Sequence, residues 1–307
     1  MTDHKTSFLV YNLLKISLIL MVGISACSYR APQIQITETP TLQPAQLIHE
    51  ISQTEFPSPT QTAVLCAETT GNMVESEVPS ELLTEPVSVK IYLPPCYDSQ
   101  SGVNYSVLYM LHGQTSMDDQ WVRIGLLTKI DELIADKKVQ PFLIVLPTEI
   151  RSNADSGQSK FGDAIIEEVI PYIEQQFNVC TKRECRAIGG LSRGGNWAVH
   201  LGFSHPKLFN AIGAHSAPLF YGEISNMLKT TAYGKNTTGL PMFYVDVGNK
   251  DPDHDDVILF LETLQDLNIP RKFSNNLGYH DEAYWHAHVE DYLLWYNSQL
   301  MPPSQTP

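Results

Sequence analysis

The strongest constraint on the fold is a regular alternation of short apolar runs with longer amphipathic stretches. Strands are predicted over residues 86–93, 105–111, 141–147, 186–190, 211–214, 242–247 and 273–277. Helical periodicity predicts helices over residues 121–137, 162–176, 194–204, 255–267 and 283–300. Strands that alternate with helices build βαβ units, so we expect a three-layer α/β domain with a mostly parallel sheet.

The composition excludes several classes of protein. The 307 residues carry 34 acidic and 20 basic side chains, for a formal charge of −14, which argues against nucleic acid as a partner. A hydrophobic fraction of 43% is too high for a disordered chain, and no internal repeat suggests a solenoid.

The N-terminus has the pattern of a secretory signal. Lys5 and Lys15 precede an apolar run over residues 16–24, and the run ends at Ile24-Ser25-Ala26-Cys27. These last residues resemble the lipobox of bacterial lipoproteins, in which the cysteine receives the lipid. We therefore expect a signal peptide over residues 1–27, lipid attachment at Cys27, and an extracytoplasmic protein anchored to the membrane. The alternative is an ordinary signal peptide and a secreted protein.

The segment after the signal is predicted to be a tether. Residues 28–65 are rich in Thr, Pro, Gln and Ser and show little apolar periodicity, so burial cannot offset their ordering entropy. The folded domain is expected over residues 66–300, and residues 301–307 are expected to form a flexible tail.

Four of the five cysteines form two candidate disulfide pairs. Cys180 and Cys185 bracket a short loop, and Cys66 with Cys96 would tie the start of the domain to its first hairpin. Buried free thiols are the alternative. A zinc site is not expected, because no CxxC pair occurs and the histidines are scattered.

The strongest local motif is Gly190-Leu191-Ser192-Arg193-Gly194-Gly195, between a predicted strand and a predicted helix. This is the context of a G-x-S-x-G nucleophile elbow, where glycines allow a serine on a strained, crowded turn. The motif predicts Ser192 as a nucleophile, with the Arg193 N–H at a helix N-terminus facing a developing oxyanion. A glycine-rich turn without catalytic function is the alternative.

An elbow serine requires an acid and a base later in the chain, in that order. His280 follows a late strand in a Gly278-Tyr279-His280-Asp281 loop and is the predicted base. Asp251 follows the predicted strand 242–247 and is the predicted acid, which would hold the imidazole tautomer. Asp253 and Asp255 are the competing candidates for this acid.

The acidic run over residues 251–256 also resembles the start of a calcium loop. An EF-hand loop needs glycine at its sixth position, where this chain has Asp256, and an apolar helical pattern begins at Val257. We therefore expect no metal.

A second oxyanion donor is predicted from the strand that ends in Leu111-His112-Gly113-Gln114. In α/β-hydrolases a loop in this position supplies an N–H to the oxyanion, and Gln114 is the residue expected to do so. An ordinary turn at the end of a strand is the alternative.

Together these segments resemble the esterase D-like family of α/β-hydrolases, which includes feruloyl, acetylxylan and enterochelin esterases and mycolyltransferases. The likeness covers roughly residues 85–297 and is carried by Tyr92-Leu93-Pro94-Pro95-Cys96-Tyr97, Leu111-His112-Gly113, Trp121, Gly189 through Gly195, His215-Ser216, Gly278-Tyr279-His280-Asp281 and Tyr284-Trp285. Many relatives have two glycines before the histidine, whereas this chain has Gly278-Tyr279, so the rim of the pocket is expected to differ.

The resemblance implies a serine carboxylic-ester hydrolase that needs no cofactor, with Ser192, Asp251 and His280 as its triad. An extracytoplasmic small-molecule or glycan ester, such as an acylated sugar or a feruloyl or acetyl ester, is the expected substrate. An acyltransferase with the same triad and a non-catalytic surface binding protein are the alternatives. Four aromatic residues could form a substrate rim or belong to the core: Trp121, Tyr221, Tyr284 and Trp285.

Overall fold

The computed structural model describes residues 66–150, 157–231 and 239–305. The signal peptide, Cys27 and the tether lie outside these residues. Within the described ranges, no helix is both long enough and apolar enough to cross a bilayer.

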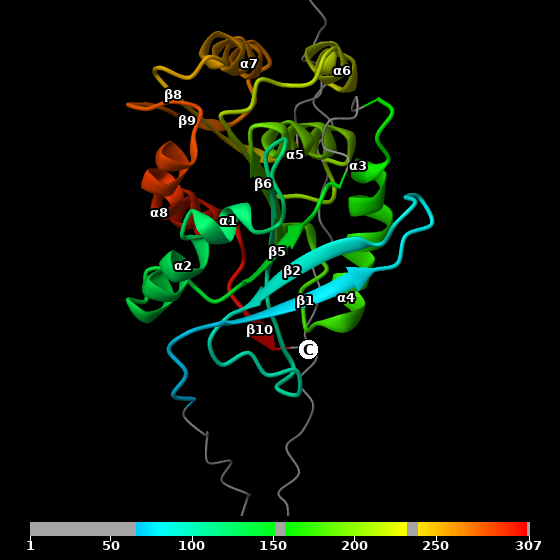
Figure 1. The fold of residues 1–307 in the computed structure, drawn as a ribbon, viewed down its shortest axis with the longest axis vertical. Helices are drawn as coiled ribbons and strands as arrows, with labels where there is room; N and C mark the ends of the chain where they lie inside the picture. Colours follow the sequence, from blue (N-terminus) through cyan, green and yellow to red (C-terminus); the bar gives the residue numbers. More distant parts are fainter. Residues whose placement is uncertain (1–65, 151–156, 232–238, 306–307) are drawn as a thin grey trace, which may run out of the picture. The chain divides into compact units, whose positions relative to one another are not determined.

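The domain is built around an eight-stranded sheet with strand order β1-β2-β5-β4-β6-β7-β8-β9 (Figure 1). Its strands are β1 (Asn72–Val78), β2 (Val87–Leu93), β4 (Val107–Leu111), β5 (Leu143–Pro147), β6 (Arg186–Leu191), β7 (Ala211–His215), β8 (Met242–Gly248) and β9 (Arg271–Asn276). The strands from β5 to β9 in this order are parallel, and β1 and β2 extend one edge in antiparallel pairing. The prediction of an α/β fold with a mostly parallel sheet is confirmed.

Helices cover both faces of the sheet, which gives the three layers. One face carries α1 (Gln120–Arg123), α2 (Leu126–Ala135) and α8 (Glu282–Gln299), and the other carries α3 (Phe161–Ala164), α4 (Ile170–Gln176), α5 (Arg193–Ser204), α6 (Glu223–Thr230) and α7 (His254–Asp266) (Figure 1). Alternation along β4 explains the two cores, because Leu108 and Met110 pack on the α8 side while Val107 and Tyr109 pack on the α5 side.

Two predicted helices are interrupted at identifiable residues. The helix expected over 121–137 is split by Gly125, whose φ of 88° is left-handed and separates α1 from α2. The helix expected over 162–176 contains a π-helical turn, Ile165–Val169, between α3 and α4. This turn ends two residues before Pro171, which has no N–H to donate and whose ring crowds the preceding turn.

Some elements were not expected from the sequence. Strand β1 reads Asn-Met-Val-Glu-Ser-Glu-Val, and only its last residue is buried, so it carries a weak apolar signal. The C-terminal end also differs from the prediction, which was a flexible tail from residue 301. Ser304–Gln305 (β10) pairs with Val103–Asn104 (β3) in a small antiparallel sheet, so backbone hydrogen bonds hold the chain in place through residue 305.

Two disulfides join the cysteines in the pairs proposed from the sequence. Cys66 is bonded to Cys96 across 30 residues, and Cys180 to Cys185 across 5. The first bond ties the segment before β1 to the turn after β2. The second closes the loop that leads into β6.

Replacing both cysteines of the Cys66–Cys96 pair by serine is expected to lower the free energy of unfolding by about 3–4 kcal/mol, because the bond restrains a long loop of the unfolded chain. The same change at Cys180 and Cys185 should cost only about 2 kcal/mol, because that loop is short. Urea unfolding followed by circular dichroism measures both losses. Equal losses would contradict this account.

Candidate active site

Ser192 is the single residue that joins β6 to α5. Its φ of 52° and ψ of −120° are strained for a residue with a side chain, at a cost of about 1–3 kcal/mol. Two backbone hydrogen bonds hold it: its N–H donates to the His215 carbonyl at 2.8 Å, and its carbonyl accepts from the Asn196 N–H at 3.0 Å. The local geometry is that of a strand-to-helix elbow.

Glycine at position 194 allows this turn to pack against the end of β4. A Cβ atom on Gly194 would lie 2.2 Å from the Leu111 carbonyl oxygen and 2.6 Å from that of His112. The start of α5 therefore lies against the His112-Gly113 turn, backbone to backbone. Arg193 is the first residue of α5, so its N–H has no acceptor within the helix.

The loops after β8 and β9 are also tied together through their backbones. The Lys250 N–H donates to the Gly278 carbonyl at 2.9 Å, and the Asn249 N–H donates to the Asn276 carbonyl at 2.7 Å. Because β6, β8 and β9 are parallel, these loops and Ser192 all lie at the carboxyl ends of the strands, on the same side of the sheet's hydrogen-bonded rows.

His280 lies in the loop after β9 and contacts Asp251 from the loop after β8. Its Nδ1–H donates to the Asp251 carboxylate, at 2.9 Å to Oδ2 and 3.1 Å to Oδ1. Trp285 packs edge-on against the imidazole, with 5.1 Å between ring centroids. The structure thus brings the predicted acid and base together, in the orientation that leaves Nε2 to accept a proton.

The electrostatics of this pair favour the charged imidazolium. Burial by itself lowers the pKa of His280, but the hydrogen bond and charge of Asp251, with the charge of Asp253, outweigh burial and raise this pKa above its usual value. For Asp251 burial alone raises the pKa, and hydrogen bonds from His280 and from the Asp253 N–H bring it below the usual range.

The competing acids lie farther from the imidazole or contact another histidine. The Asp253 carboxylate is 3.6 Å from His280 Nδ1, and Asp255 is fully exposed beside His254. The side chain of Asp251 is completely buried. Asp251 is therefore the best placed of the three candidates to orient the base.

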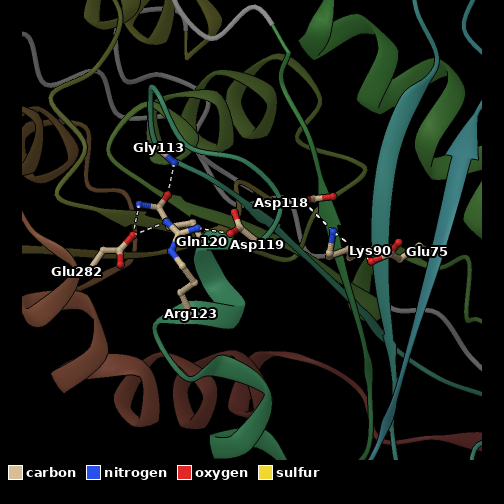
Figure 2. A network of polar contacts seen from close by, with 8 residues as sticks. All are labelled: Glu75, Lys90, Gly113, Asp118, Asp119, Gln120, Arg123 and Glu282. Atoms are coloured by element: carbon tan, nitrogen blue, oxygen red, sulfur yellow. Dashed lines mark hydrogen bonds and ion pairs between the residues drawn. The ribbon is translucent and has the colours of Figure 1, made fainter.

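The turn at the end of β4 holds the second predicted oxyanion donor, Gln114, at the surface. The N–H of Gly113 donates to Gln120 Oε1 at 2.8 Å, so this amide is already committed (Figure 2). Figure 2 also shows the other side of the Gln120 amide directed at Glu282, at the start of α8, with Nε2 to Oε1 at 3.4 Å. Gln120 thus links the turn before Gln114 to the helix that follows His280.

Several buried polar residues near this edge were not identified from the sequence. The clearest is Glu149, which lies two residues after β5 and binds the side chain of Arg193. Another group is centred on Asp246 of β8. Its carboxylate contacts His215 of β7 at 2.5 Å and accepts hydrogen bonds from Tyr284 and Tyr292. The available signal was a carboxylate two residues after an apolar strand for Glu149, and one within an apolar strand for Asp246.

The predicted aromatic rim is mostly core. Trp121, Tyr284 and Trp285 are each less than 5% exposed, whereas Tyr221 is fully exposed. Among the described residues, two groups could approach a metal ion: Asp251 with Asp253 and His280, and Cys66 with Glu68 and Cys96. The two cysteines of the second group are joined in a disulfide, so neither can supply a thiolate.

The arrangement of a strained serine elbow, an Asp–His pair and a helix N-terminus at one edge of a parallel sheet defines the serine-hydrolase class of α/β proteins. A family model described as "Putative esterase" matches residues 80–304. The chain belongs to this esterase family.

Individual relatives point in the same direction. An endo-1,4-beta-xylanase/feruloyl esterase of Xylanibacter ruminicola is 28% identical over 165 residues, which cover 50% of this chain and 22% of the relative. An acetyl esterase of Caldicellulosiruptor saccharolyticus is 31% identical over 126 residues, which cover 41% of this chain and 46% of the relative. The chain thus spans less than half the length of both relatives.

Among solved structures, a ferulic acid esterase superposes with a TM-score of 0.68 and 24% identity. The superposition covers 76% of this chain and all of that one. At this level of identity the match shows that the two chains share a fold.

Replacing Asp251 by Asn is expected to lower the pKa of His280, because a neutral amide stabilises the imidazolium less than a carboxylate does. Asp253→Asn should lower it less, since that carboxylate is more distant and more exposed. An NMR titration of the histidine ring protons, assigned with His280→Gln, measures both shifts. Equal shifts would contradict the assignment of Asp251 as the main partner.

The same pair should make the stability of the fold depend on pH. The pKa of His280 is raised in the folded protein, so protonated His280 contributes to the free energy of unfolding. This contribution is fully present below the pKa of the unfolded chain, about 6.5, and is lost as the pH rises through the pKa of the folded protein.

Proposed function

We propose that this protein hydrolyses carboxylic esters through an acyl-enzyme on Ser192. The observation that carries the proposal is the hydrogen bond between buried Asp251 and partly buried His280, at the same end of the parallel strands as the strained Ser192 elbow. Membership of the esterase family and the names of the two relatives support the same activity.

The proposed reaction has two halves. Ser192 Oγ attacks the ester carbonyl while His280 Nε2 takes its proton, and the N–H groups of Arg193 and Gln114 stabilise the tetrahedral oxyanion. The imidazolium then protonates the leaving alcohol, which departs and leaves an acyl-serine. Water attacks this ester with His280 as base, and the carboxylic acid leaves as Ser192 recovers its proton. Asp251 holds the imidazole tautomer throughout.

We propose an ester of a sugar, with a feruloyl or acetyl acyl group, as the substrate class. The xylanase/feruloyl esterase and the acetyl esterase among the relatives support this choice. An acyltransferase with the same triad would pass the acyl group to an alcohol instead of water. Product analysis with an added alcohol acceptor distinguishes the two, because only the transferase forms a new ester.

Treatment of the full-length protein with a fluorophosphonate is expected to add one adduct at Ser192, because Asp251 and His280 activate this hydroxyl. Intact-mass spectrometry measures the adduct, and Ser192→Ala should show none. Ser298→Ala is a control that should label like the wild type, since Ser298 is an exposed serine near the end of α8. A folded wild-type protein that does not label would refute the proposed nucleophile.

We also propose that the protein acts outside the cytoplasm on a lipid anchor at Cys27. The signal-like N-terminus supports this, as do the two disulfides, because such bonds persist in oxidising compartments.

Cells that express the protein and are fed an alkyne-tagged fatty acid should incorporate the tag, because the lipid attaches to the thiol of Cys27. Gel fluorescence after coupling the alkyne to a dye measures it, with Cys27→Ala as the unlabelled comparison. Equal labelling of the two proteins, or none in either, would contradict the anchor.

A further inference from the structure

Glu149 is a buried carboxylate that the proposed reaction does not use. It follows β5 by two residues and is 4% exposed. Its two oxygens accept hydrogen bonds from Arg193 Nε and Nη2, both at 2.7 Å, so the contact with the guanidinium is bidentate. Trp197 Nε1 donates to the same carboxylate at 3.0 Å. Glu149 therefore fixes the first turn of α5 to the end of β5.

The backbone of the same residue fixes the other side of the oxyanion site. The Glu149 N–H donates to His112 Nε2 at 2.8 Å, so the proton of the neutral ring is on Nδ1, which donates to the Gly113 carbonyl at 2.8 Å. Burial lowers the pKa of His112, which favours this neutral ring. Residue 149 thus contacts both the residue that begins α5 and the turn that carries Gln114.

These contacts converge on the two amides that the proposed function assigns to the oxyanion. An oxyanion site works only when its donors are held at the place where charge develops, and a shift of 1 Å can cost about 100-fold in rate. Gly113 cannot substitute for Gln114, because its N–H already donates to Gln120 Oε1 (Figure 2). The His112-Gly113 turn is therefore held by two contacts: the Gly113 N–H donates to Gln120, and His112 accepts from the Glu149 N–H.

Stability alone gives a weak reason for this buried ion pair. Desolvating a carboxylate and a guanidinium can cost as much free energy as their attraction returns, and apolar replacements are often as stable. A bidentate pair does, however, fix the orientation of both partners. The aromatic rings of Trp197 and Phe220 also contact Arg193. Their centroids lie 5.7 and 5.4 Å from the guanidinium carbon Cζ.

We propose that Glu149 is a positioning residue for ester hydrolysis, which holds the Arg193 and Gln114 amides in register by binding Arg193 with its side chain and His112 with its backbone. The inference rests on the proposed function, because it assigns Glu149 a role in stabilising the same oxyanion. It acts through Arg193 and His112 and does not contact the substrate.

The test compares Glu149→Gln with Glu174→Gln in the full-length protein. Glu174 lies on α4 and pairs with the buried Arg186 at the start of β6, the opposite end of the strand that carries Ser192. Both changes remove one carboxylate from a buried arginine. We expect Glu149→Gln to lower kcat for an activated ester by about 100-fold with little change in KM, and Glu174→Gln to leave kcat unchanged.

A second readout separates positioning from general destabilisation. A trifluoromethyl ketone forms a tetrahedral adduct with an active serine, so its inhibition constant should rise in Glu149→Gln in proportion to the fall in kcat/KM. The melting temperature of each variant measures the structural loss. Equal loss of activity in the two variants would overturn the proposal. If Glu149→Gln does not fold, Glu149→Asp and Glu174→Asp replace the pair with the same criteria, because the shorter side chain withdraws the carboxylate from Arg193.

The direction of the effect also separates positioning from charge. Without Glu149 the positive charge of Arg193 is no longer neutralised, and charge alone would stabilise an oxyanion and raise kcat. A kcat that rises or stays constant would therefore overturn the proposal. Fluorophosphonate labelling distinguishes the two levels: failure of the wild type to label refutes the proposed function, while labelling with an unchanged kcat in Glu149→Gln refutes only the role of Glu149.

Discussion

Ser192 connects β6 to α5 with one residue in a strained backbone conformation, and the arrangement of the whole sheet edge depends on that connection. A longer loop would relax the strain but would move α5 away from the end of β4. The short connection brings the first turn of the helix against the His112-Gly113 turn, with no room for a Cβ at Gly194. Close packing of the parallel strands and helices around the elbow over-determines the conformation, so a local cost of about 1–3 kcal/mol is tolerated.

His280, the predicted base, is held by a second set of contacts. Strand β8 contains Asp246, whose buried carboxylate accepts hydrogen bonds from Tyr284 and Tyr292 of α8. Five residues later the same strand leads to Asp251, which holds His280 just before that helix begins. Asp246 of β8 therefore binds helix α8, and Asp251 after β8 binds the loop before that helix. These contacts restrict the position of the imidazole. Gln120 also hydrogen-bonds Glu282 at the start of this helix and accepts from the Gly113 N–H, which links the helix to the turn after β4.

The sequence predicts the parts of the fold and site that have strong local signals. Continuous apolar runs predict β4 and β5, and glycines around a serine predict the elbow. The elements that the sequence does not predict depend on contacts between distant parts of the chain. Strand β1 pairs with β2 along its whole length, but only its last residue is buried. The π turn before Pro171 depends on one residue that disturbs an otherwise good helical pattern. His215 gives no sequence signal for its burial against Asp246, because an isolated polar residue in a short strand has many possible roles.

Glu149 and Asp251 occupy equivalent places in the sheet, and the comparison explains why only one was predicted. Strand β6 is flanked by β4 and then β5 on one side, and by β7 and then β8 on the other. Each carboxylate comes shortly after one of these strands, Glu149 after β5 and Asp251 after β8. Each is buried and binds a residue of the predicted site: Glu149 binds Arg193, and Asp251 binds His280. The acid of a triad has a known order in the chain, so a search after Ser192 finds Asp251. Glu149 precedes the elbow by more than forty residues, and only the pairing of β4 with both β5 and β6 brings it to the same edge.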